Sequence, residues 1–265
     1  MPLADLGDVK IYYEEEGKGE AIVLLAGYSC DVSWWHSVAS FLKPYFHLIL
    51  LDYRGGGKSE SSKPFTIRDC ANDTIKVMDH LKIEKASFVG HSMGGTIAQD
   101  VAAFFPDRVK DLFLICSLPK IHPASAFSLH TGLRLREAKI PVDLLIDIGL
   151  PWSFSSQFLT DAKKVADFKK FLLSNPNPAT LDGLRHRLEA LCNFDSRPYL
   201  QKIRAKTLVI STGRDFFIPR QDTELLAKHI SGAKLIFLQE EGHNPLLECP
   251  EKLAKTIHDF TQQSH

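Results

Sequence analysis

A serine flanked by glycines lies between two segments of different apolar periodicity. Residues 86–89 predict a buried strand, and Ile97 and Val101 follow at the spacing of one helix face. The turn that joins them is Gly90-His91-Ser92-Met93-Gly94-Gly95. A strand-to-helix turn this short crowds its own backbone, which favours glycine on both sides of Ser92 and directs the serine hydroxyl above the sheet edge. The pattern therefore predicts a strand, a tight turn and a helix in succession.

The turn has the G-x-S-x-G pattern of a nucleophile elbow. Ser92 is accordingly the predicted nucleophile. The backbone N–H of Met93, in the first turn of the next helix, is a predicted oxyanion donor, because unpaired N–H groups and the helix dipole favour negative charge there. The alternative is that Ser92 only turns the chain, as in many isolated matches to this short pattern. The strand before it and the helix after it favour the catalytic interpretation.

Strands and helices alternate along most of the chain. Apolar runs predict strands over residues 21–25, 47–51, 109–116, 207–211 and 234–238, with an edge strand over residues 9–15. Helical periodicity is found over residues 33–42, 66–81, 221–230 and 250–260. This alternation predicts an α/β fold in which a mostly parallel, twisted sheet is covered by helices on both faces.

The alternation lapses in the middle of the chain. Residues 118–196 contain helical patterns over 129–139, 163–173 and 179–191, interrupted by prolines and without a clear strand. We therefore expect a helical insertion over residues 118–196, lying as a lid across the carboxyl edge of the sheet. Residues 1–117 and 197–265 would form the α/β core.

Two further residues are predicted to complete a catalytic triad with Ser92. His243 follows the last predicted strand, at the sheet edge where the Ser92 hydroxyl emerges, and is the preferred base among 11 histidines. Asp215 follows the preceding strand, and the order serine, aspartate, histidine is the one that this motif class uses. Asp215 could alternatively cap a helix or pair with Arg214.

Tyr28 follows the strand over residues 21–25, and its backbone N–H is the predicted second oxyanion donor. This role does not involve the tyrosine side chain, which the sequence leaves as either a functional group or an ordinary loop residue.

Composition argues against several other classes of protein. The chain carries 32 basic and 32 acidic side chains, which gives no general attraction to nucleic acid or to an anionic membrane. The 5 cysteines include no C-x-x-C pair, so neither a disulfide framework nor a zinc site is indicated. Asp52 and Ile22 occupy positions where phosphate-binding and dinucleotide-binding motifs need glycine. No apolar run is long enough to span a membrane, and we expect a cytoplasmic protein.

Taken together, these segments resemble the α/β-hydrolase superfamily over nearly the whole chain. The residues that carry the resemblance are Gly27, Asp52-Tyr53-Arg54-Gly55-x-Gly57-x-Ser59, the elbow at Ser92, Gly213-Arg214-Asp215-x-x-x-x-Pro219 and Gly242-His243. Within the superfamily, the chain is similar to small carboxylesterases, the 3-oxoadipate enol-lactonase group and the pimeloyl-carrier-protein methyl ester esterases. The resemblance implies a helical lid and no metal or organic cofactor. Ala26-Gly27 departs from the His-Gly of many members, which leaves the shape of the oxyanion loop open.

Two functions follow as expectations. The first is hydrolysis of carboxylic esters, lactones or thioesters through an acyl-enzyme on Ser92. The second is a signalling or ligand-binding protein with an intact triad and little turnover. It is expected because residues 27–35 are also similar to the hydrolase-fold stress regulators. The serine at the elbow argues against the haloalkane dehalogenase branch, which carries aspartate there.

The insertion is rich in large apolar side chains. Phe127, Trp152, Phe154 and Phe158, together with Leu133, are predicted to line a pocket for a hydrophobic part of a small-molecule substrate. The alternative is that they pack the insertion onto the core. The insertion also carries four arginines, which suggest a docking surface for an acyl carrier protein. The alternative is that they form a mixed, solvated face with the acidic residues near them. The arginines are Arg134, Arg136, Arg185 and Arg187, and the acidic residues are Glu137, Asp182 and Glu189. The sequence does not predict the oligomeric state.

Overall fold

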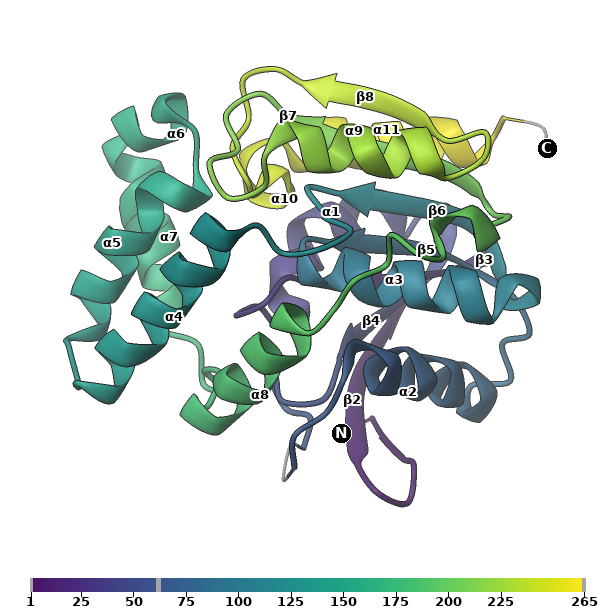
Figure 1. Ribbon diagram of the computed structural model, residues 1–265, viewed down its shortest axis with the longest axis horizontal. Helices are drawn as coiled ribbons and strands as arrows, with labels where there is room; N and C mark the ends of the chain where they lie inside the picture. The colour runs from purple at the N-terminus through teal and green to yellow at the C-terminus, as the bar shows by residue number, and fades with distance from the viewer. Residues whose placement is uncertain (1, 61–62, 264–265) are drawn as a thin grey trace.

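The predicted strands form one mixed sheet in a computed structural model that describes residues 2–60 and 63–263 (Figure 1). Over these residues the sheet has eight strands in the order β1-β2-β4-β3-β5-β6-β7-β8. The strands are β1 (Leu3–Asp5), β2 (Lys10–Glu16), β3 (Glu20–Leu25), β4 (Phe46–Asp52), β5 (Ala86–His91), β6 (Val109–Ile115), β7 (Lys206–Thr212) and β8 (Lys234–Leu238). β1 pairs antiparallel with β2 and β2 antiparallel with β4, whereas the other pairings are parallel. The prediction of a mostly parallel sheet is confirmed. β1 was not predicted, because three residues are too short to show alternation.

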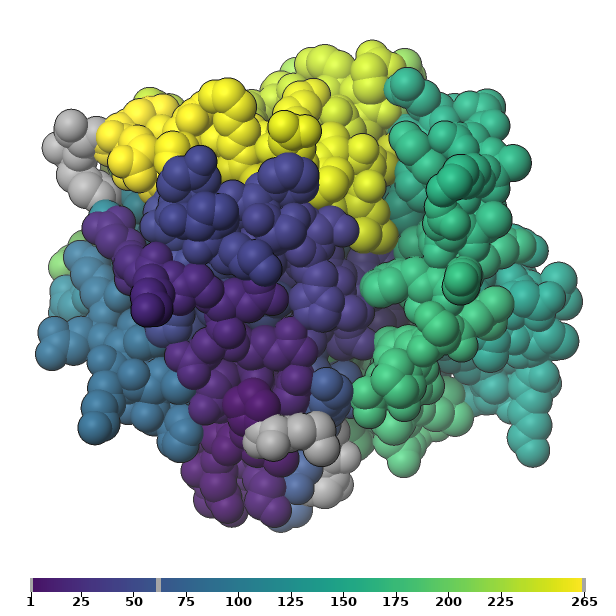
Figure 2. All heavy atoms as spheres, turned by 180° about the vertical axis from the view of Figure 1, so that it is seen from behind, coloured from purple at the N-terminus to yellow at the C-terminus, as the bar shows by residue number. Residues whose placement is uncertain are grey.

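Helices cover both faces of the sheet, as predicted. One face packs against α2 (Ile67–His80), α3 (Met93–Phe104) and α9 (Arg220–His229), and the other against α1 (His36–Leu42) and α11 (Pro250–Thr261). Figure 2 shows the molecule from behind, on the side of this second face, with α11 in yellow beside the blue-purple segment that contains α1. Successive residues of β3 serve the two cores in turn: Val23 and Leu25 lie in one apolar cluster, and Ile22 and Leu24 in the other.

The helical insertion is present at the carboxyl edge of the sheet. It consists of α4 (Pro123–Glu137), α5 (Val142–Ser153), α6 (Ser156–Thr160), α7 (Ala162–Leu173) and α8 (Leu181–Cys192), drawn in teal to green in Figure 1. α5 lies outside the helical patterns found in the sequence, since Pro141 precedes it and Pro151 lies inside it. Pro123 begins α4 instead of breaking it, because the first helical position needs no backbone N–H.

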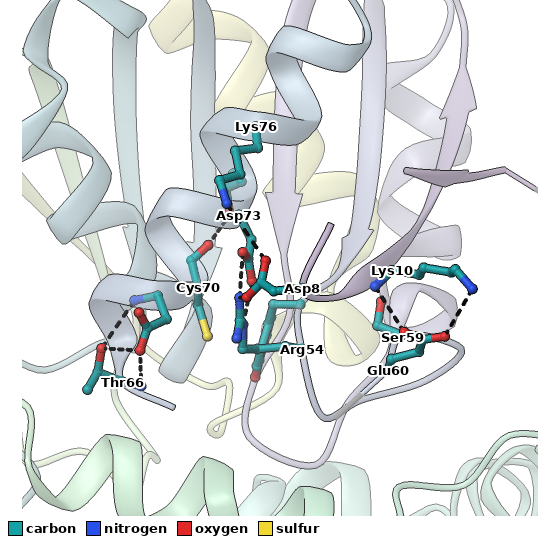
Figure 3. Close-up of polar contacts among 12 residues, drawn as sticks. Asp8, Lys10, Arg54, Ser59, Glu60, Thr66, Cys70, Asp73 and Lys76 are labelled. Atoms are coloured by element: carbon teal, nitrogen blue, oxygen red, sulfur yellow. Dashed lines mark hydrogen bonds and ion pairs between the residues drawn. The ribbon is translucent and has the colours of Figure 1, made fainter. Parts of the chain in front are cut away.

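An ion pair fixes the loop that follows β4. The guanidinium of Arg54 binds both carboxylate oxygens of Asp73 on α2 at 2.5 and 2.7 Å, and Asp8 lies beside the pair (Figure 3). Asp73 is almost fully buried, so a two-pronged contact of this kind holds the loop firmly. Ser59 makes a second contact that holds the loop, since its hydroxyl accepts a hydrogen bond from the Tyr12 amide at 2.8 Å. The loop that contains Tyr53 and Arg54 is thereby held against α2 and β2.

Candidate active site

The turn at Ser92 has the geometry of a nucleophile elbow. Ser92 adopts φ 53° and ψ −119°, a conformation that side chains rarely adopt, and α3 begins at the next residue. A Cβ at Gly90 would lie 2.5 Å from the Gly94 carbonyl oxygen, and one at Gly94 would lie 2.1 Å from that of Leu25. Both glycines are therefore required by close approach of the backbone, as the sequence predicted.

Ser92, His243 and Asp215 lie in hydrogen-bonded succession. The Ser92 hydroxyl is 3.0 Å from His243 Nε2, and His243 Nδ1 is 2.8 Å from Asp215 Oδ2. Because the carboxylate can only accept, His243 carries its proton on Nδ1 and presents Nε2 as an acceptor to the serine. The imidazole and the carboxylate are 10% and 3% exposed, which strengthens the interaction between them.

Asp215 is held independently of the histidine. Its Oδ1 accepts hydrogen bonds from the backbone N–H groups of Phe217 and Ile218 at 2.7 and 2.8 Å. Arg214 does not pair with it and lies 3.9 Å from Glu240 instead. The alternative of an Arg214–Asp215 pair is therefore wrong, and the carboxylate is aimed at His243 by its own turn.

His91, inside the elbow, makes a hydrogen bond to the backbone of His243. Its Nε2 is 2.7 Å from the backbone carbonyl oxygen of His243, so Nε2 carries the hydrogen. Burial, reinforced by the nearby His243, lowers the pKa of His91 to about 3, which keeps the ring neutral. In the sequence, His91 is part of the elbow motif and has no predicted role.

The predicted oxyanion donors belong to two different segments of the chain. Met93 is the first residue of α3, so its N–H has no helical partner, and Tyr28 lies in the loop directly after β3. The Tyr53 hydroxyl donates to the Gly27 carbonyl at 2.7 Å, and the Tyr28 hydroxyl donates to the Leu184 carbonyl at 2.9 Å. The Tyr28 side chain thus binds α8 of the insertion, a contact that the sequence did not predict.

A buried cysteine adjoins Asp215 and His243. Cys116, Asp215 and His243 bring a thiol, a carboxylate and an imidazole within 4.8 Å of one another. The carboxylate and the imidazole are already hydrogen-bonded to each other, so this group is accounted for without a metal ion. Burial, followed by the charge of Asp215, raises the pKa of the Cys116 thiol, which therefore stays neutral beside the carboxylate.

A cavity of about 580 Å³ opens onto Ser92 and His243. Its walls come mainly from the loop after β3, from α4 and α5, and from the segment after Asp215, and most of them are apolar. Phe127 and Trp152 line it, as predicted, and are 76% and 37% exposed. Its volume and lining match those of small-molecule sites.

The prediction was wrong for Phe154, Phe158 and Leu133, none of which lines this cavity. The rings of Phe154 and Phe158 stack at a centroid distance of 4.1 Å and are buried in the core that contains α11. Leu133 packs with Leu184 and Leu188 between α4 and α8. Phe154 and Phe158 therefore pack the insertion onto the core, which was the stated alternative, whereas Leu133 joins two helices of the insertion to each other.

The arginines of the insertion have three different environments. Arg185 pairs with Glu137 and Asp182 at 3.0 and 2.5 Å, which makes that part of the surface a mixed-charge face. Arg136 lines the cavity, and no aspartate or glutamate does so among the described residues. Arg187 is fully buried, so both surface interpretations of this residue were wrong. The missed signal was its position, because it lies on the apolar face of α8 with Leu184 and Leu191.

No helix in the described part of the chain is long and apolar enough to cross a membrane.

Comparison with known proteins agrees with this architecture. Residues 20–250 match the family described as alpha/beta hydrolase fold. The chain is 27% identical over 246 residues to RutD of Pseudomonas savastanoi pv. phaseolicola, whose name refers to carbamate hydrolysis, and the match covers 90% of this chain and 92% of RutD. It is 28% identical over 253 residues to 3-oxoadipate enol-lactonase 2 of Acinetobacter baylyi, covering 94% and 92%.

Among solved structures, the enol-lactonase from Burkholderia xenovorans LB400 superposes with a TM-score of 0.87 at 27% identity, covering 99% of this chain and 100% of that one. The family match extends over most of the sequence and includes the segments that carry Ser92, Asp215 and His243. The chain belongs to the alpha/beta hydrolase fold family.

Proposed function

We propose that this protein is a carboxylic ester hydrolase that forms an acyl-enzyme on Ser92, with Asp215 and His243 completing the triad. The observation that carries the proposal is the hydrogen-bonded succession from Ser92 Oγ through the His243 ring to Asp215, at the floor of a mostly apolar cavity. A serine, a base and an orienting carboxylate in this arrangement activate the hydroxyl near neutral pH.

In the acylation step, Ser92 Oγ attacks the ester carbonyl carbon while His243 Nε2 takes the hydroxyl proton. The negative charge that develops on the carbonyl oxygen is stabilised by the N–H groups of Tyr28 and Met93. Collapse of the tetrahedral intermediate expels the alcohol, which receives the proton from His243. Asp215 stays ionised and stabilises the imidazolium in between.

Deacylation repeats the same chemistry with water. His243 removes a proton from a water molecule as its oxygen attacks the acyl carbon, and the same two N–H groups receive the second oxyanion. Release of the acid returns the proton to Ser92. Neither step requires an oxidant or a further co-substrate.

The insertion, residues 118–196, is proposed to act as a lid that selects the substrate. α4 and α5 supply much of the cavity wall, and Phe127, Ile148 and Trp152 leave apolar surface exposed at its margin. Such a wall favours an ester with a hydrophobic acyl or alcohol part. The names of the relatives widen the set of test substrates to lactones and carbamates, which share an attackable carbonyl with esters.

Turnover of p-nitrophenyl butyrate by the wild type and by Ser92→Ala tests the proposal. We expect Ser92→Ala to lose nearly all activity, because the nucleophile is removed. Ser37→Ala, at an exposed position on α1 outside the cavity lining, is the matched control and should retain activity. Equal hydrolysis by the wild type and Ser92→Ala would refute the mechanism.

A second measurement separates the enzyme from the signalling alternative. A fluorophosphonate probe should label Ser92 in the wild type, and esters of increasing chain length, lactones, carbamates and acyl-carrier-protein esters should include at least one substrate that is turned over efficiently. Strong labelling without turnover of any of them would favour a binding protein with an intact triad.

A further inference from the structure

Arg187 is a buried cation without a buried anion bound to it. Its side chain is fully enclosed on α8, and no carboxylate within the described ranges lies within ion-pair distance of it. The charge of Arg187 acts on the buried carboxylate of Asp52 without an ion pair between them, since the oxygens of Asp52 accept the N–H groups of Val32 and Lys58 at 2.8 and 2.9 Å. Burying an unpaired charge is costly, so the surroundings of Arg187 must compensate for the loss of water.

The compensation comes from backbone carbonyl groups of two loops. Nη1 donates to the carbonyl oxygens of Tyr28 and Cys30 at 2.7 and 3.1 Å, and Nη2 donates to that of Tyr53 at 3.2 Å. The guanidinium carbon also lies 4.1 Å from the centroid of the Tyr53 ring. A planar fork with several fixed donors meets these groups together, which a lysine ammonium cannot do in the same way.

The space around the guanidinium is shaped to admit it. A Cβ at Gly56 would lie 1.4 Å from Nη2, and a Cβ at Gly183 on α8 would lie 2.3 Å from the Gly55 carbonyl oxygen. Glycine at these positions therefore allows α8 to approach the loop after β4 closely enough for Arg187 to reach past it. The hydrogen bonds of the Arg187 guanidinium are made to the segment that contains the Tyr28 amide.

Peptide planarity connects these contacts to the oxyanion site. The Tyr28 N–H belongs to the same peptide group as the Gly27 carbonyl, which the Tyr53 hydroxyl holds at 2.7 Å. In a planar trans peptide the N–H points opposite to the carbonyl, so fixing one fixes the other. Arg187 holds the next carbonyl, that of Tyr28, and stacks on the ring of Tyr53, the residue that holds the first.

We propose that Arg187 is a positioning residue for the oxyanion site, which makes the direction of the Tyr28 N–H depend on the docking of α8. The inference rests on the proposed ester hydrolysis and adds to it that the insertion supports catalysis as well as enclosing the cavity. The hydrogen bonds from Arg187 also polarise the loop peptides, and its positive charge favours the negative charge of the tetrahedral intermediate.

Variants of Arg187 separate this role from simple packing. For Arg187→Lys and Arg187→Met we expect kcat for p-nitrophenyl butyrate to fall roughly 10- to 100-fold with KM changed by less than about twofold, because only the transition state carries the oxyanion. Inhibition by phenylboronic acid, whose adduct with Ser92 imitates that intermediate, should weaken by a similar factor. Arg185→Met, on the exposed face of the same helix, is the control and should change neither quantity.

Tyr53→Phe provides a second route if an Arg187 variant fails to fold. It removes only the hydroxyl that holds the Gly27 carbonyl and should lower kcat and boronate affinity together, again with little change in KM. The inference is overturned if folded Arg187 variants, or Tyr53→Phe, keep the wild-type kcat and boronate affinity and lose only thermal stability. Failure of the proposed function is distinct, because it would appear as Ser92-independent turnover or no turnover in the wild type.

Discussion

The His91 ring donates a hydrogen bond of 2.7 Å to the backbone carbonyl of His243, so the residue before the proposed nucleophile holds the backbone of the proposed base. The two rings lie 5.0 Å apart, and the other nitrogen of His91, Nδ1, has no hydrogen-bond partner among the described residues. A charge on His91 would oppose the imidazolium that the proposed mechanism places on His243. Burial prevents this, because it lowers the pKa of His91 to about 3.

The first prediction concerns stability as a function of pH. An unfolded chain protonates His91 below about pH 6.5, whereas the folded chain keeps it neutral down to about pH 3. Since the unfolded state then binds more protons, the His91 contribution is fully present above about pH 6.5 and is lost as pH falls toward 3. His91→Gln does not titrate, and its amide can still donate to the His243 carbonyl.

The free energy of unfolding should be measured by urea denaturation at pH 7, 6 and 5 for both proteins. We expect the wild type to lose stability relative to His91→Gln by up to about 1.4 kcal/mol per pH unit below 6.5. Asp52, whose pKa burial raises to about 6, titrates in both proteins and is expected to cancel in the comparison. A difference independent of pH would contradict a buried neutral His91.

The second prediction concerns Asp215→Asn. The Oδ1 contacts with the Phe217 and Ile218 amides can persist, so the fold should be retained. An amide NH₂ facing His243 Nδ1 favours the wrong tautomer, which places the hydrogen on Nε2 and removes the acceptor for Ser92. We expect kcat to fall by about 10³- to 10⁴-fold with a melting temperature close to that of the wild type. Retention of more than about a tenth of kcat would show that Asp215 does not orient the base.

The topology of the sheet explains why the sequence could bring Ser92, Asp215 and His243 together. Ser92, Asp215 and His243 each follow a parallel strand, and the carboxyl ends of parallel strands meet at one edge. The residue order and the glycines at the elbow then reduced the choice among the histidines. The topology predicts that the three residues share one edge of the sheet, and the structure adds the distances of 3.0 and 2.8 Å between their side chains.

Residues that act across the insertion could not be predicted in the same way. Arg187 lies on α8, and Phe154 directly follows α5. The packing of both segments depends on contacts far away in sequence, and periodicity does not say which neighbour a helix face meets. Composition suggested that Phe154 lined the pocket and Arg187 the surface, yet both are buried. An arginine on an apolar helix face indicates a buried partner. The partners here are backbone carbonyl groups, which every residue has, so the sequence cannot identify them.

The third prediction concerns the charge preference of the cavity. Arg136 lines the cavity beside Tyr28, and no acidic side chain in the described part of the molecule shares that lining. An anionic group on the substrate would gain an exposed ion pair, worth about 0.5–1 kcal/mol. Arg136→Gln should therefore lower kcat/KM for a half-ester of a dicarboxylic acid by about two- to fivefold relative to a neutral ester of equal length.

Arg134→Gln is the matched control for the Arg136 variant, since Arg134 lies on the same helix outside the cavity lining. It should leave the ratio of kcat/KM values for the two esters unchanged, and added salt should reduce the wild-type preference for the half-ester. Equal effects of the two variants would attribute the preference to net charge instead of to Arg136.

The last prediction separates residues that line the cavity from residues that fasten the insertion. Phe127 and Trp152 line the cavity and are partly exposed, whereas Phe154 lies 4.6 Å from Phe168, ring centre to ring centre, in a core that is closed to solvent. Phe127→Ala and Trp152→Ala should reduce the preference for longer acyl chains, measured as kcat/KM for p-nitrophenyl esters from acetate to decanoate, with little change in unfolding free energy. Phe154→Ala should destabilise the fold by about 3–5 kcal/mol, because it leaves a cavity among aromatic rings, and should keep the chain-length preference of the wild type below its lowered melting temperature. The opposite assignment, with stability lost in the first two variants and chain preference lost in the third, would mean that the insertion packs differently from the arrangement described.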